Sequence, residues 1–237
     1  MTGIIGAMEG EIQGLRDLMD NISVIRKSGM DFYKGILHGE PVVVVQSGVG
    51  KVNAGICAAL LINVFCVDNV INTGIAGSLD NKISIGDIVL STDAVQHDFD
   101  ATSYGKYDYG HIPGFKEPYF KADEHLRQMA EKASERINSD INVFSGRIVS
   151  GDQFICDNSK KKWLKKRFDA FCTEMEGAAV AQAAVLGNIP FLIIRAISDK
   201  ADDNTTVDFQ EFQKKAMEHS VKLTSEIIRI IKEEKFA

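Results

Sequence analysis

The sequence predicts a single-domain α/β protein with three α/β/α layers around a central mixed β-sheet. Short apolar runs alternate along the chain with longer segments of helical spacing, the order expected when strands and covering helices follow one another. Two apolar runs are joined by a tight turn, which adds antiparallel pairing to the parallel sheet. No linker, repeat or low-complexity segment interrupts residues 1–237, so we expect one domain.

The N-terminal elements are predicted to be a strand, a helix, a hairpin and a second helix. Residues 3–8 (GIIGAM) form a short apolar run that indicates a buried strand, and residues 9–20 have helical spacing. Residues 32–48 predict a β-hairpin that turns at His38–Pro41. Residues 50–66 again have helical spacing, with many small residues.

Further strands and helices complete the predicted sheet and its cover. Apolar runs of strand length predict strands at residues 69–77, 86–98, 146–154 and 191–199. Apolar residues on one side predict helices over residues 122–138 and from about residue 209. The basic segment 160–167 (KKKWLKKR) is expected to be a solvated helix face with Trp163 and Leu164 packed inward.

Composition argues against several classes of function. With a formal charge of -6, the chain has no electrostatic reason to bind nucleic acid or an anionic membrane. The cysteines form no CxxC pair and the histidines have no metal-ligand spacing, so we expect a cytoplasmic protein with reduced thiols and no metal. We expect neither a signal peptide nor a membrane span, since no apolar run approaches the ~20 residues that a membrane helix needs.

Residues 98–120 do not fit a plain scaffold. The segment has no convincing strand or helix, and a loop of this length is usually functional or disordered. It holds four of the five tyrosines and three phenylalanines, which argues against disorder. Three interpretations of an ordered loop remain: it packs on its own domain, on a second subunit or over a pocket.

The chemistry is expected where the strands end, because ligands of open α/β sheets bind beyond the carboxyl ends of strands. Carboxylates, glycines and one arginine gather in the segments MEGE (8–11), SGVGKV (47–52), NTGIAGS (72–78), SGDQFI (150–155) and RAISDKAD (195–202). Gly50–Lys51 is not part of a phosphate-binding P-loop, because Val45 and Val52 stand where that motif needs a glycine and a hydroxyl residue. The GxGxxG and GxSxG motifs are absent as well.

The stretch FCTEMEGAAVAQAA (171–184) brings Glu174 and Glu176 to the start of a helical segment. Thr173 and Glu176 have the spacing of a capping box, which is a purely structural interpretation. Paired carboxylates also suit cleavage of an N-ribosidic bond, because negative charge stabilises the oxocarbenium-like transition state. An ionised carboxylate can accept both hydroxyls of a ribose diol. This segment alone leaves both interpretations open.

The motifs together carry a resemblance. GIIGAMEGE, SGVGK, NTGIAG, GDIV, SGDQFI, EMEGAA and RAISDKAD come in the order seen in bacterial 5′-methylthioadenosine/S-adenosylhomocysteine nucleosidases. The chain resembles this family over essentially its whole length. The resemblance implies a nucleoside phosphorylase-like fold, a homodimer and no cofactor. It also implies hydrolysis of the N-ribosidic bond of 5′-methylthioadenosine and S-adenosylhomocysteine, with 5′-deoxyadenosine as a further substrate.

Roles for single residues follow from the same resemblance. Glu11 would activate the attacking water, Asp199 would protonate adenine at N7, and Glu176 would hold the ribose 2′ and 3′ hydroxyls. The remaining implied contacts within the chain are Ile75 and Ala76 in the NTGIAG loop, Met175 on the ribose face, Arg195 near Glu176, Phe154 and Ile155 at adenine, Ser198 beside Asp199, and Met8, Val49 and Phe209 around the 5′-alkylthio group. Ala101, Tyr104 and Pro113 would complete the pocket of the partner subunit.

Two positions depart from the family pattern, and three other classes of function stay open. Ile75 stands where many relatives have serine, so a hydroxyl contact to the ribose would be lost, and Gly10 replaces an acid and is expected to loosen its helix by about 1 kcal/mol. A phosphorylase would need cationic groups for phosphate, which the loops after the early strands lack. Hydrolysis of futalosine or AMP, and nucleoside binding without catalysis, are the two remaining classes.

Overall fold

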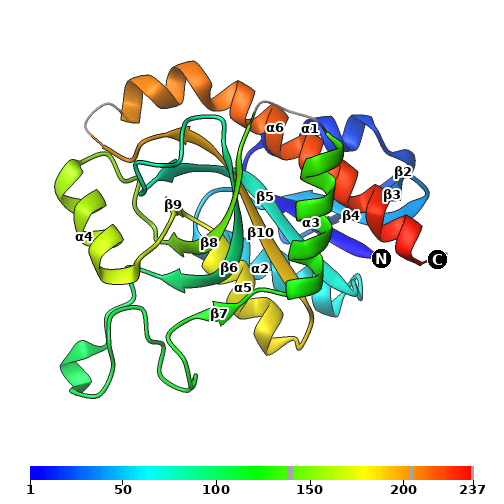
Figure 1. The fold of residues 1–237 in the computed structure, drawn as a ribbon. Coiled ribbons are helices and arrows are strands. Elements are labelled where there is room, and N and C mark those ends of the chain that lie inside the picture. The colour runs from blue at the N-terminus through cyan, green and yellow to red at the C-terminus, as the bar shows by residue number, and fades with distance from the viewer. Residues whose placement is uncertain (138–140, 203–204, 236–237) are drawn as a thin grey trace.

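The computed structural model describes residues 1–137, 141–202 and 205–235 (Figure 1). The strands are β1 (Thr2–Gly6), β2 (Asp20–Lys27), β3 (Met30–Leu37), β4 (Glu40–Gln46), β5 (Asn69–Ser78), β6 (Ile88–Gln96), β7 (Phe120–Lys121), β8 (Val143–Ser150), β9 (Cys172–Glu174) and β10 (Phe191–Asp199). The helices are α1 (Glu9–Asp17), α2 (Lys51–Asn63), α3 (Glu124–Arg136), α4 (Asn158–Phe168), α5 (Gly177–Leu186) and α6 (Thr205–Glu234), with a 3₁₀ turn, η1, at Thr102–Tyr104.

All described strands belong to one mixed sheet, as the sequence predicts. β1 lies parallel to β4 and β5, and β5 lies parallel to β10, so the carboxyl ends of these strands share one edge. β2, β3 and β4 form an antiparallel meander at the opposite end of the sheet. β5 is long enough to pair with β1 near its start and with β9 at its end. The strands β5, β10, β6, β8 and β9 therefore close into a ring.

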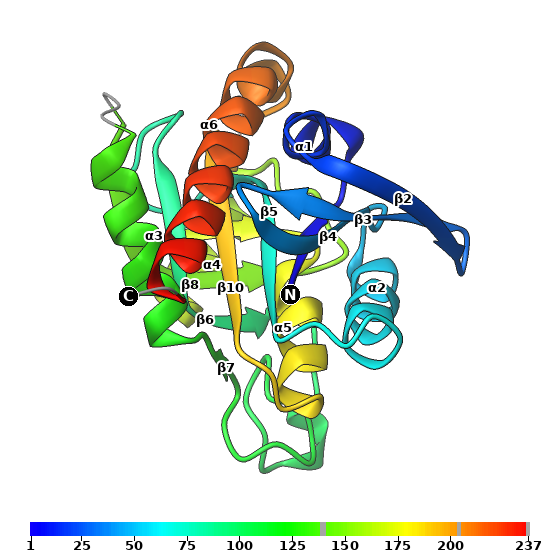
Figure 2. The ribbon, with the colours of Figure 1, turned by 90° about the vertical axis from the view of Figure 1, so that its right-hand side faces the viewer.

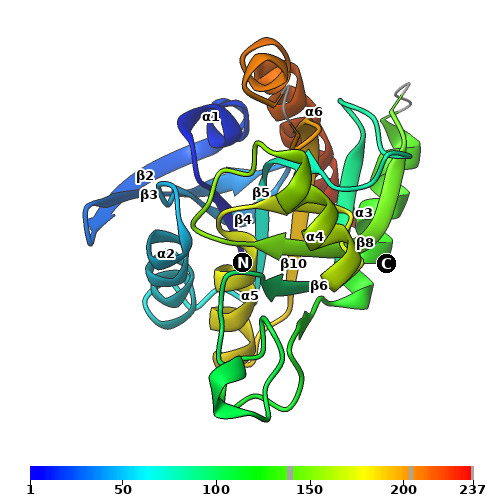
Figure 3. The same cartoon turned by 90° about the vertical axis from the view of Figure 1, so that its left-hand side faces the viewer.

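Helices cover both faces of the sheet, which confirms the three predicted layers (Figures 1, 2 and 3). Successive strand residues point to opposite faces, and β1 shows this directly. Ile4 packs with residues of α1, α3 and α6, whereas Ile5 packs with residues of α2 and α5. Both isoleucines are fully buried, so β1 contributes to the apolar core on each face of the sheet.

Several element boundaries differ from the prediction. The predicted helix 9–20 ends at Asp17, and β2 follows it unexpectedly. Every residue of β2 is exposed, so the segment lacks the buried alternation that marks a strand in sequence. The predicted strand 146–154 begins earlier and stops at Ser150, which leaves residues 151–154 as a loop. Residue 138, the predicted end of the helix that forms α3, lies outside the described residues.

The basic segment forms α4, and one of its lysines is not solvated as expected. Leu164 is buried and Trp163 is partly buried beside it, as predicted. Lys161 is also buried, and its Nζ donates to the Lys200 carbonyl at 2.6 Å. The Asp202 carboxylate lies 3.5 Å from Nζ, so a hydrogen bond and an ion pair together offset the burial of this cation.

Residues between β6 and β7 project from the body of the molecule, at the bottom of Figures 1 and 3. This is the segment 98–120, whose only regular structure among its residues is η1 and the first residue of β7. Tyr104 is 77% exposed there, whereas Ala101 is buried. Within this segment, Ala101 therefore packs inward while Tyr104 faces outward.

Candidate active site

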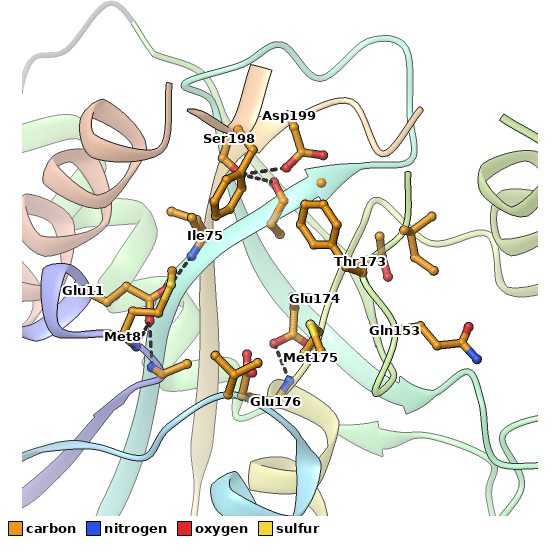
Figure 4. A pocket seen from close by; sticks show the side chains of 17 residues that line it. Met8, Glu11, Ile75, Gln153, Thr173, Glu174, Met175, Glu176, Ser198 and Asp199 are labelled. Atoms are coloured by element: carbon orange, nitrogen blue, oxygen red, sulfur yellow. Dashed lines mark hydrogen bonds between the residues drawn. The ribbon is translucent and has the colours of Figure 1, made fainter. Parts of the chain in front are cut away.

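A cavity of about 180 Å³ lies at the edge of the sheet where β1, β5, β9 and β10 end (Figure 4). The start of α1, the start of α6 and the loop after β8 complete its wall. Its lining residues are Ala7, Met8, Glu11, Val49, Ile75, Ala76, Gly77, Gln153, Phe154, Ile155, Thr173, Glu174, Met175, Glu176, Ser198, Asp199 and Phe209. The strand ends therefore converge on one site, as the sequence predicts.

Glu11 is held in the first turn of α1 by three backbone groups (Figure 4). Its Oε2 accepts the N–H groups of Ala7 at 2.7 Å and Met8 at 2.9 Å, and its Oε1 accepts the Ile75 N–H at 3.1 Å. A Cβ atom on residue 74 would lie 2.5 Å from Glu11 Oε1, so the approach of this carboxylate requires Gly74. Burial raises the pKa of Glu11, although the positive charge of Arg195 opposes the rise.

Glu174 and Arg195 form a buried ion pair behind the cavity. Glu174 Oε2 accepts from Arg195 Nε at 3.2 Å and also from its Nη2, while Oε1 accepts the Ser150 hydroxyl. Arg195 is further oriented by Asn72, whose Oδ1 accepts from Nη2 at 2.6 Å. Burial acts to raise the pKa of Glu174, but Arg195 and these hydrogen bonds hold it below its ordinary value.

Glu174, not Glu176, caps the helix that follows, so the capping-box interpretation is wrong. Glu176 is itself the N-cap residue of α5 and makes no side-chain cap bond. The free N–H groups of Glu176 and Gly177 donate to Glu174 Oε2 at 3.1 Å and 2.8 Å. Within the described part of the chain, the Thr173 hydroxyl has no hydrogen-bond partner. The side chain of Glu176 is therefore not used to cap α5.

The Glu176 carboxylate faces the cavity from the start of α5 (Figure 4). Its Oε1 accepts the Gly50 N–H at 2.8 Å, and its Oε2 lies 4.0 Å from Arg195 Nη2. Burial and the nearby charge of Glu174 raise the pKa of Glu176 to about 7. Because the Gly50 N–H binds Oε1, Oε2 of the ionised carboxylate is available as an acceptor for hydroxyl groups.

Asp199 stands at the end of β10, across the cavity from these acids (Figure 4). Its Oδ2 accepts the Ser198 hydroxyl at 2.8 Å, and its Oδ1 accepts the Ala201 N–H at 2.8 Å and the Thr205 hydroxyl at 3.2 Å. Asp199 is 3% exposed, and burial raises the pKa of its carboxyl group. A raised pKa favours the protonated form, which is what a general acid needs.

Aromatic and aliphatic side chains form the remaining wall. Phe154 and Phe209 meet edge to face, with ring centroids 5.5 Å apart and an interplanar angle of 85°. Phe154 is 51% exposed and Val49 is 49% exposed, so two large apolar side chains offer surface at the cavity mouth. Met8 lines the same cavity as Val49 and Phe209. This wall suits an apolar substituent, while the carboxylates suit polar groups.

Most of the predicted site residues come together, and a few do not. Arg195 does not line the cavity but supports it from behind, through Glu174. Ala101, Tyr104 and Pro113 are absent from the lining of this chain's own cavity. That is the arrangement expected if they serve a second subunit.

Sequence reasoning missed four lining residues and two supporting ones. The cavity is also lined by Ala7, Gly77, Gln153 and Thr173, and the ion pair is supported by Asn72 and Ser150. Most of them lie at a strand end or within three residues of one, so the position of the strand ends was the signal that could have found them. No group of three or more metal-ligating side chains occurs among the described residues, and no described helix could span a membrane.

Comparison with known proteins places this geometry in a family. The family model of the phosphorylase superfamily matches residues 2–229. The chain is 43% identical to the 5′-methylthioadenosine/S-adenosylhomocysteine nucleosidase of Anoxybacillus flavithermus, covering 93% of this chain and 94% of that protein.

Two solved structures are similar over nearly the full chain. The Neisseria meningitidis 5′-methylthioadenosine/S-adenosylhomocysteine nucleosidase in complex with methylthio-immucillin-A superposes with a TM-score of 0.93 at 38% identity, covering 97% of this chain and 98% of that one. The futalosine hydrolase of Helicobacter pylori gives a TM-score of 0.91 at 32% identity, covering 96% of both chains. The chain belongs to the phosphorylase superfamily, and within it to the family of 5′-methylthioadenosine/S-adenosylhomocysteine nucleosidases.

Proposed function

We propose that the protein hydrolyses the N-ribosidic bond of 5′-methylthioadenosine and S-adenosylhomocysteine. We propose that it also hydrolyses 5′-deoxyadenosine, whose 5′ group would bind in the same apolar pocket. The observation that carries the proposal is one cavity lined by the carboxyl groups of Glu11, Glu176 and Asp199 together with apolar side chains. The family membership of the chain supports the same reaction. The products are adenine and the 5-substituted ribose.

Glu11 is the base in this proposal. Water attacks C1′ of the ribose and transfers a proton to the Glu11 carboxylate, while the C1′–N9 bond breaks and its electron pair passes to adenine. The raised pKa of Glu11 makes its carboxylate a better proton acceptor than an exposed glutamate. The Ala7, Met8 and Ile75 N–H groups fix its direction before substrate arrives.

Asp199 is the acid. Adenine leaves poorly as an anion, so its N7 must gain a proton as the bond to C1′ breaks. The buried, raised-pKa carboxyl of Asp199 can supply that proton, and the Ser198 hydroxyl and the Ala201 N–H stabilise the carboxylate that remains. The adenine ring is held by Phe154, which stacks on it, and by the backbone of Ile155.

Glu176 binds the sugar. Its carboxylate accepts the 2′ and 3′ hydroxyls and places negative charge beside the cationic ribose of the transition state. Met175 packs against the ribose face, and the Ile75 and Ala76 segment lies on the other side of the cavity. Met8, Val49 and Phe209 surround the 5′ substituent.

The electrostatics favour water over phosphate as the nucleophile. Glu11, Glu174 and Glu176 surround one guanidinium, that of Arg195, which is already paired with Glu174. The negative charge of these carboxylates would repel phosphate, whereas it would not repel neutral water. The same reasoning disfavours AMP, because the wall around the 5′ position is apolar.

We further infer that the active unit is a homodimer in which Ala101, Tyr104 and Pro113 complete the partner's pocket. Tyr104 is 77% exposed, and the segment that carries it projects from the body. A groove between α2 and α5 adds exposed apolar side chains, with Val52 at 72% and Leu186 at 71%. A second copy of the chain would cover both features.

The test is adenine release from 5′-methylthioadenosine in phosphate-free buffer, followed across substrates. We expect release from 5′-methylthioadenosine, S-adenosylhomocysteine and 5′-deoxyadenosine, and little from AMP, whose charged 5′ group meets the apolar wall. Futalosine is the informative rival, because one similar structure is a futalosine hydrolase. Efficient cleavage of futalosine with no cleavage of 5′-methylthioadenosine would refute the proposal.

A further inference from the structure

The loop before α2 reaches the sugar-binding carboxylate through one backbone group. Gly50 donates its N–H to Glu176 Oε1 at 2.8 Å. Gly50 is also the N-cap residue of α2, with φ at +100°, and as a glycine it has no side chain to cap the helix. Another group must therefore satisfy the first N–H groups of α2 and hold this loop in place.

Asp152 supplies that group from the loop after β8, where it lines the groove between α2 and α5. Its Oδ1 accepts the Lys51 N–H at 2.8 Å and would lie 3.2 Å from a Cβ atom on residue 50. The Asp152 carboxylate thus sits over the N-terminus of α2, where a negative charge is favourable. Asp152 belongs to the loop after β8, the same loop that carries Phe154 and Ile155.

Asp98 anchors Asp152 in turn. The Asp152 N–H donates to Asp98 Oδ2 at 2.9 Å, and Lys51 Nζ lies 2.5 Å from Asp98 Oδ1. Lys51 Nζ also donates to Gln96 Oε1 at 3.1 Å. Two residues, Lys51 and Asp152, are therefore each bound at both backbone and side chain within one network, which fixes the two loops relative to each other.

We propose that Asp152 is a positioning residue, which holds the Gly50 N–H on Glu176 and so couples the base-binding loop to the ribose-binding carboxylate. The inference rests on the proposed function of Glu176. It assigns to Asp152 a task that acts through another residue and requires no contact with substrate.

The network has a consequence for the ionisation of Glu176. Burial is the largest cause of the rise of its pKa to about 7, and the charges of Glu174 on β9 and Glu11 on α1 add to that rise. Arg195 on β10 and the Gly50 N–H lower the pKa. Loss of the Gly50 hydrogen bond removes one of these two lowering groups. The pKa then rises further, and the ionised form needed to accept hydroxyls is lost at a higher pH.

The test compares Asp152→Ala with Asp152→Asn. Asparagine keeps an oxygen acceptor for the Lys51 N–H, whereas alanine removes it. We expect Asp152→Ala to lower kcat/KM for 5′-methylthioadenosine by ~10-fold, the effect of one ordinary hydrogen bond. The acid limb of its pH profile should move up by ~0.5–1 pH unit. Asp152→Asn should restore most of both.

Binding of adenine alone reports on the base-binding loop and not on the loop that carries Gly50. The backbone N–H of residue 152 remains in both variants and still donates to Asp98, so the base-binding loop keeps its anchor. Adenine should therefore bind to Asp152→Ala as it does to the wild type. Asp157→Ala is the control: it removes the N-cap of α4, whose carboxylate accepts the Lys160 N–H at 2.8 Å, and should lower the melting temperature without moving the acid limb.

A binding readout keeps this inference separate from the proposed function. The 7-deaza analogue of 5′-methylthioadenosine lacks the nitrogen that Asp199 protonates, so calorimetry can follow its binding whether or not the enzyme turns over substrate. Its affinity should fall ~10-fold in Asp152→Ala and recover in Asp152→Asn. Equal losses in the two variants, an unmoved acid limb, or wild-type behaviour of Asp152→Ala would overturn the positioning role. Failure of the wild type to release adenine would instead count against the proposed reaction.

Discussion

At the scale of single residues, the local surroundings give the acids of the site different pKa values. Glu174 is paired with Arg195 and its pKa lies below the ordinary value, so it stays ionised. Glu176 lacks such a close partner, and its pKa rises to about 7. The pKa of Asp199 rises through burial, which suits a proton donor. Three carboxyl groups in one site are thus prepared for three tasks.

Glu176→Gln tests the ribose contact. The amide must present a donor where an acceptor is needed, and the negative charge beside the ribose is lost, so turnover should fall ~10²-fold or more. A 2′-deoxy substrate should lose less, because one of the two contacts is already missing. Equal losses for the two substrates would show that Glu176 does not hold the 2′ hydroxyl.

The same variant has a stability signature with a definite sign. The folded-state pKa of Glu176 lies above its unfolded value, so the folded state binds the extra proton. This contribution to stability is complete below the unfolded pKa and is lost as pH rises through about 7. The melting temperature of Glu176→Gln, relative to that of the wild type, should therefore be higher at pH 8 than at pH 5. A variant that loses more stability at pH 8 than at pH 5 would contradict the raised pKa.

Asp199→Asn tests the acid. Asparagine keeps the size of the side chain but has no titrating proton, and positioned acid catalysis contributes ~10²–10⁴-fold. Turnover should fall by that factor with nucleoside binding largely kept. In the wild type, activity should fall as pH rises through the raised pKa of Asp199, and this basic limb should vanish in the variant. Near-normal turnover in the variant would remove Asp199 from the mechanism.

The two departures from the family pattern have physical accounts. A Cβ atom on residue 10 would lie 2.6 Å from the Met217 sulfur, so Gly10 allows α1 to pack closely on α6. Ile75 lacks a hydroxyl, but its N–H still binds Glu11 Oε1. The backbone thus keeps its contact with Glu11, the proposed catalytic base.

At the scale of elements, the junction of β9 and α5 is the structural centre of the site. Three residues of β9 bring Glu174 to the two free N–H groups of α5, and Glu176 follows at the turn. The ion pair with Arg195 ties this junction to β10. The junction therefore connects the fold of the sheet with the direction of the Glu176 carboxylate, which we propose binds the sugar.

Glu174→Ala should be strongly destabilising. It leaves the guanidinium of Arg195, which is 1% exposed, without its carboxylate partner, and removal of one member of a buried pair costs about 3–5 kcal/mol. Denaturant unfolding measures the loss. Glu9→Ala is a matched control, because Glu9 pairs with Arg16 at the surface and should contribute less than about 1 kcal/mol. Similar losses for both variants would contradict the structural role of Glu174.

Apolar periodicity was sufficient to predict the buried strands and the helices that cover them. It was insufficient for β2, which has no buried residue, and for β9, which is only three residues long. The capping-box spacing at Thr173 predicted the wrong N-cap, because local sequence cannot show that Glu174 also faces a buried arginine. Gly50 and Asp152 come together only through tertiary packing, so no local pattern indicated their contact.

At the scale of the whole molecule, two exposed features lie outside the folded core. The segment 98–120 projects from the body, and the groove between α2 and α5 leaves Val52 and Leu186 exposed. Single exposed apolar residues are ordinary, but a groove lined by several of them marks an interaction surface. The proposed homodimer would cover both features.

Sedimentation tests the dimer. The wild type should sediment as two chains, and Leu186→Glu should shift it towards a monomer, because a buried charge in an apolar interface is costly. Activity should fall with dimer content if the segment 98–120 completes the partner's pocket. Leu18→Glu is the control, because Leu18 is 52% exposed at the C-terminal end of α1 and lies outside the groove. A fully active wild-type monomer at assay concentration would refute the shared pocket.

The central claim is that the acids of the cavity direct water, and not phosphate, to C1′ of the ribose. The most direct measurement is the identity of the sugar product when 5′-methylthioadenosine is cleaved in phosphate buffer, determined by mass spectrometry. Free 5-methylthioribose with no phosphorylated sugar, at a rate that phosphate does not increase, is the predicted result. Formation of 5-methylthioribose 1-phosphate would contradict the account, because phosphate would then have entered a site whose carboxylates should repel it.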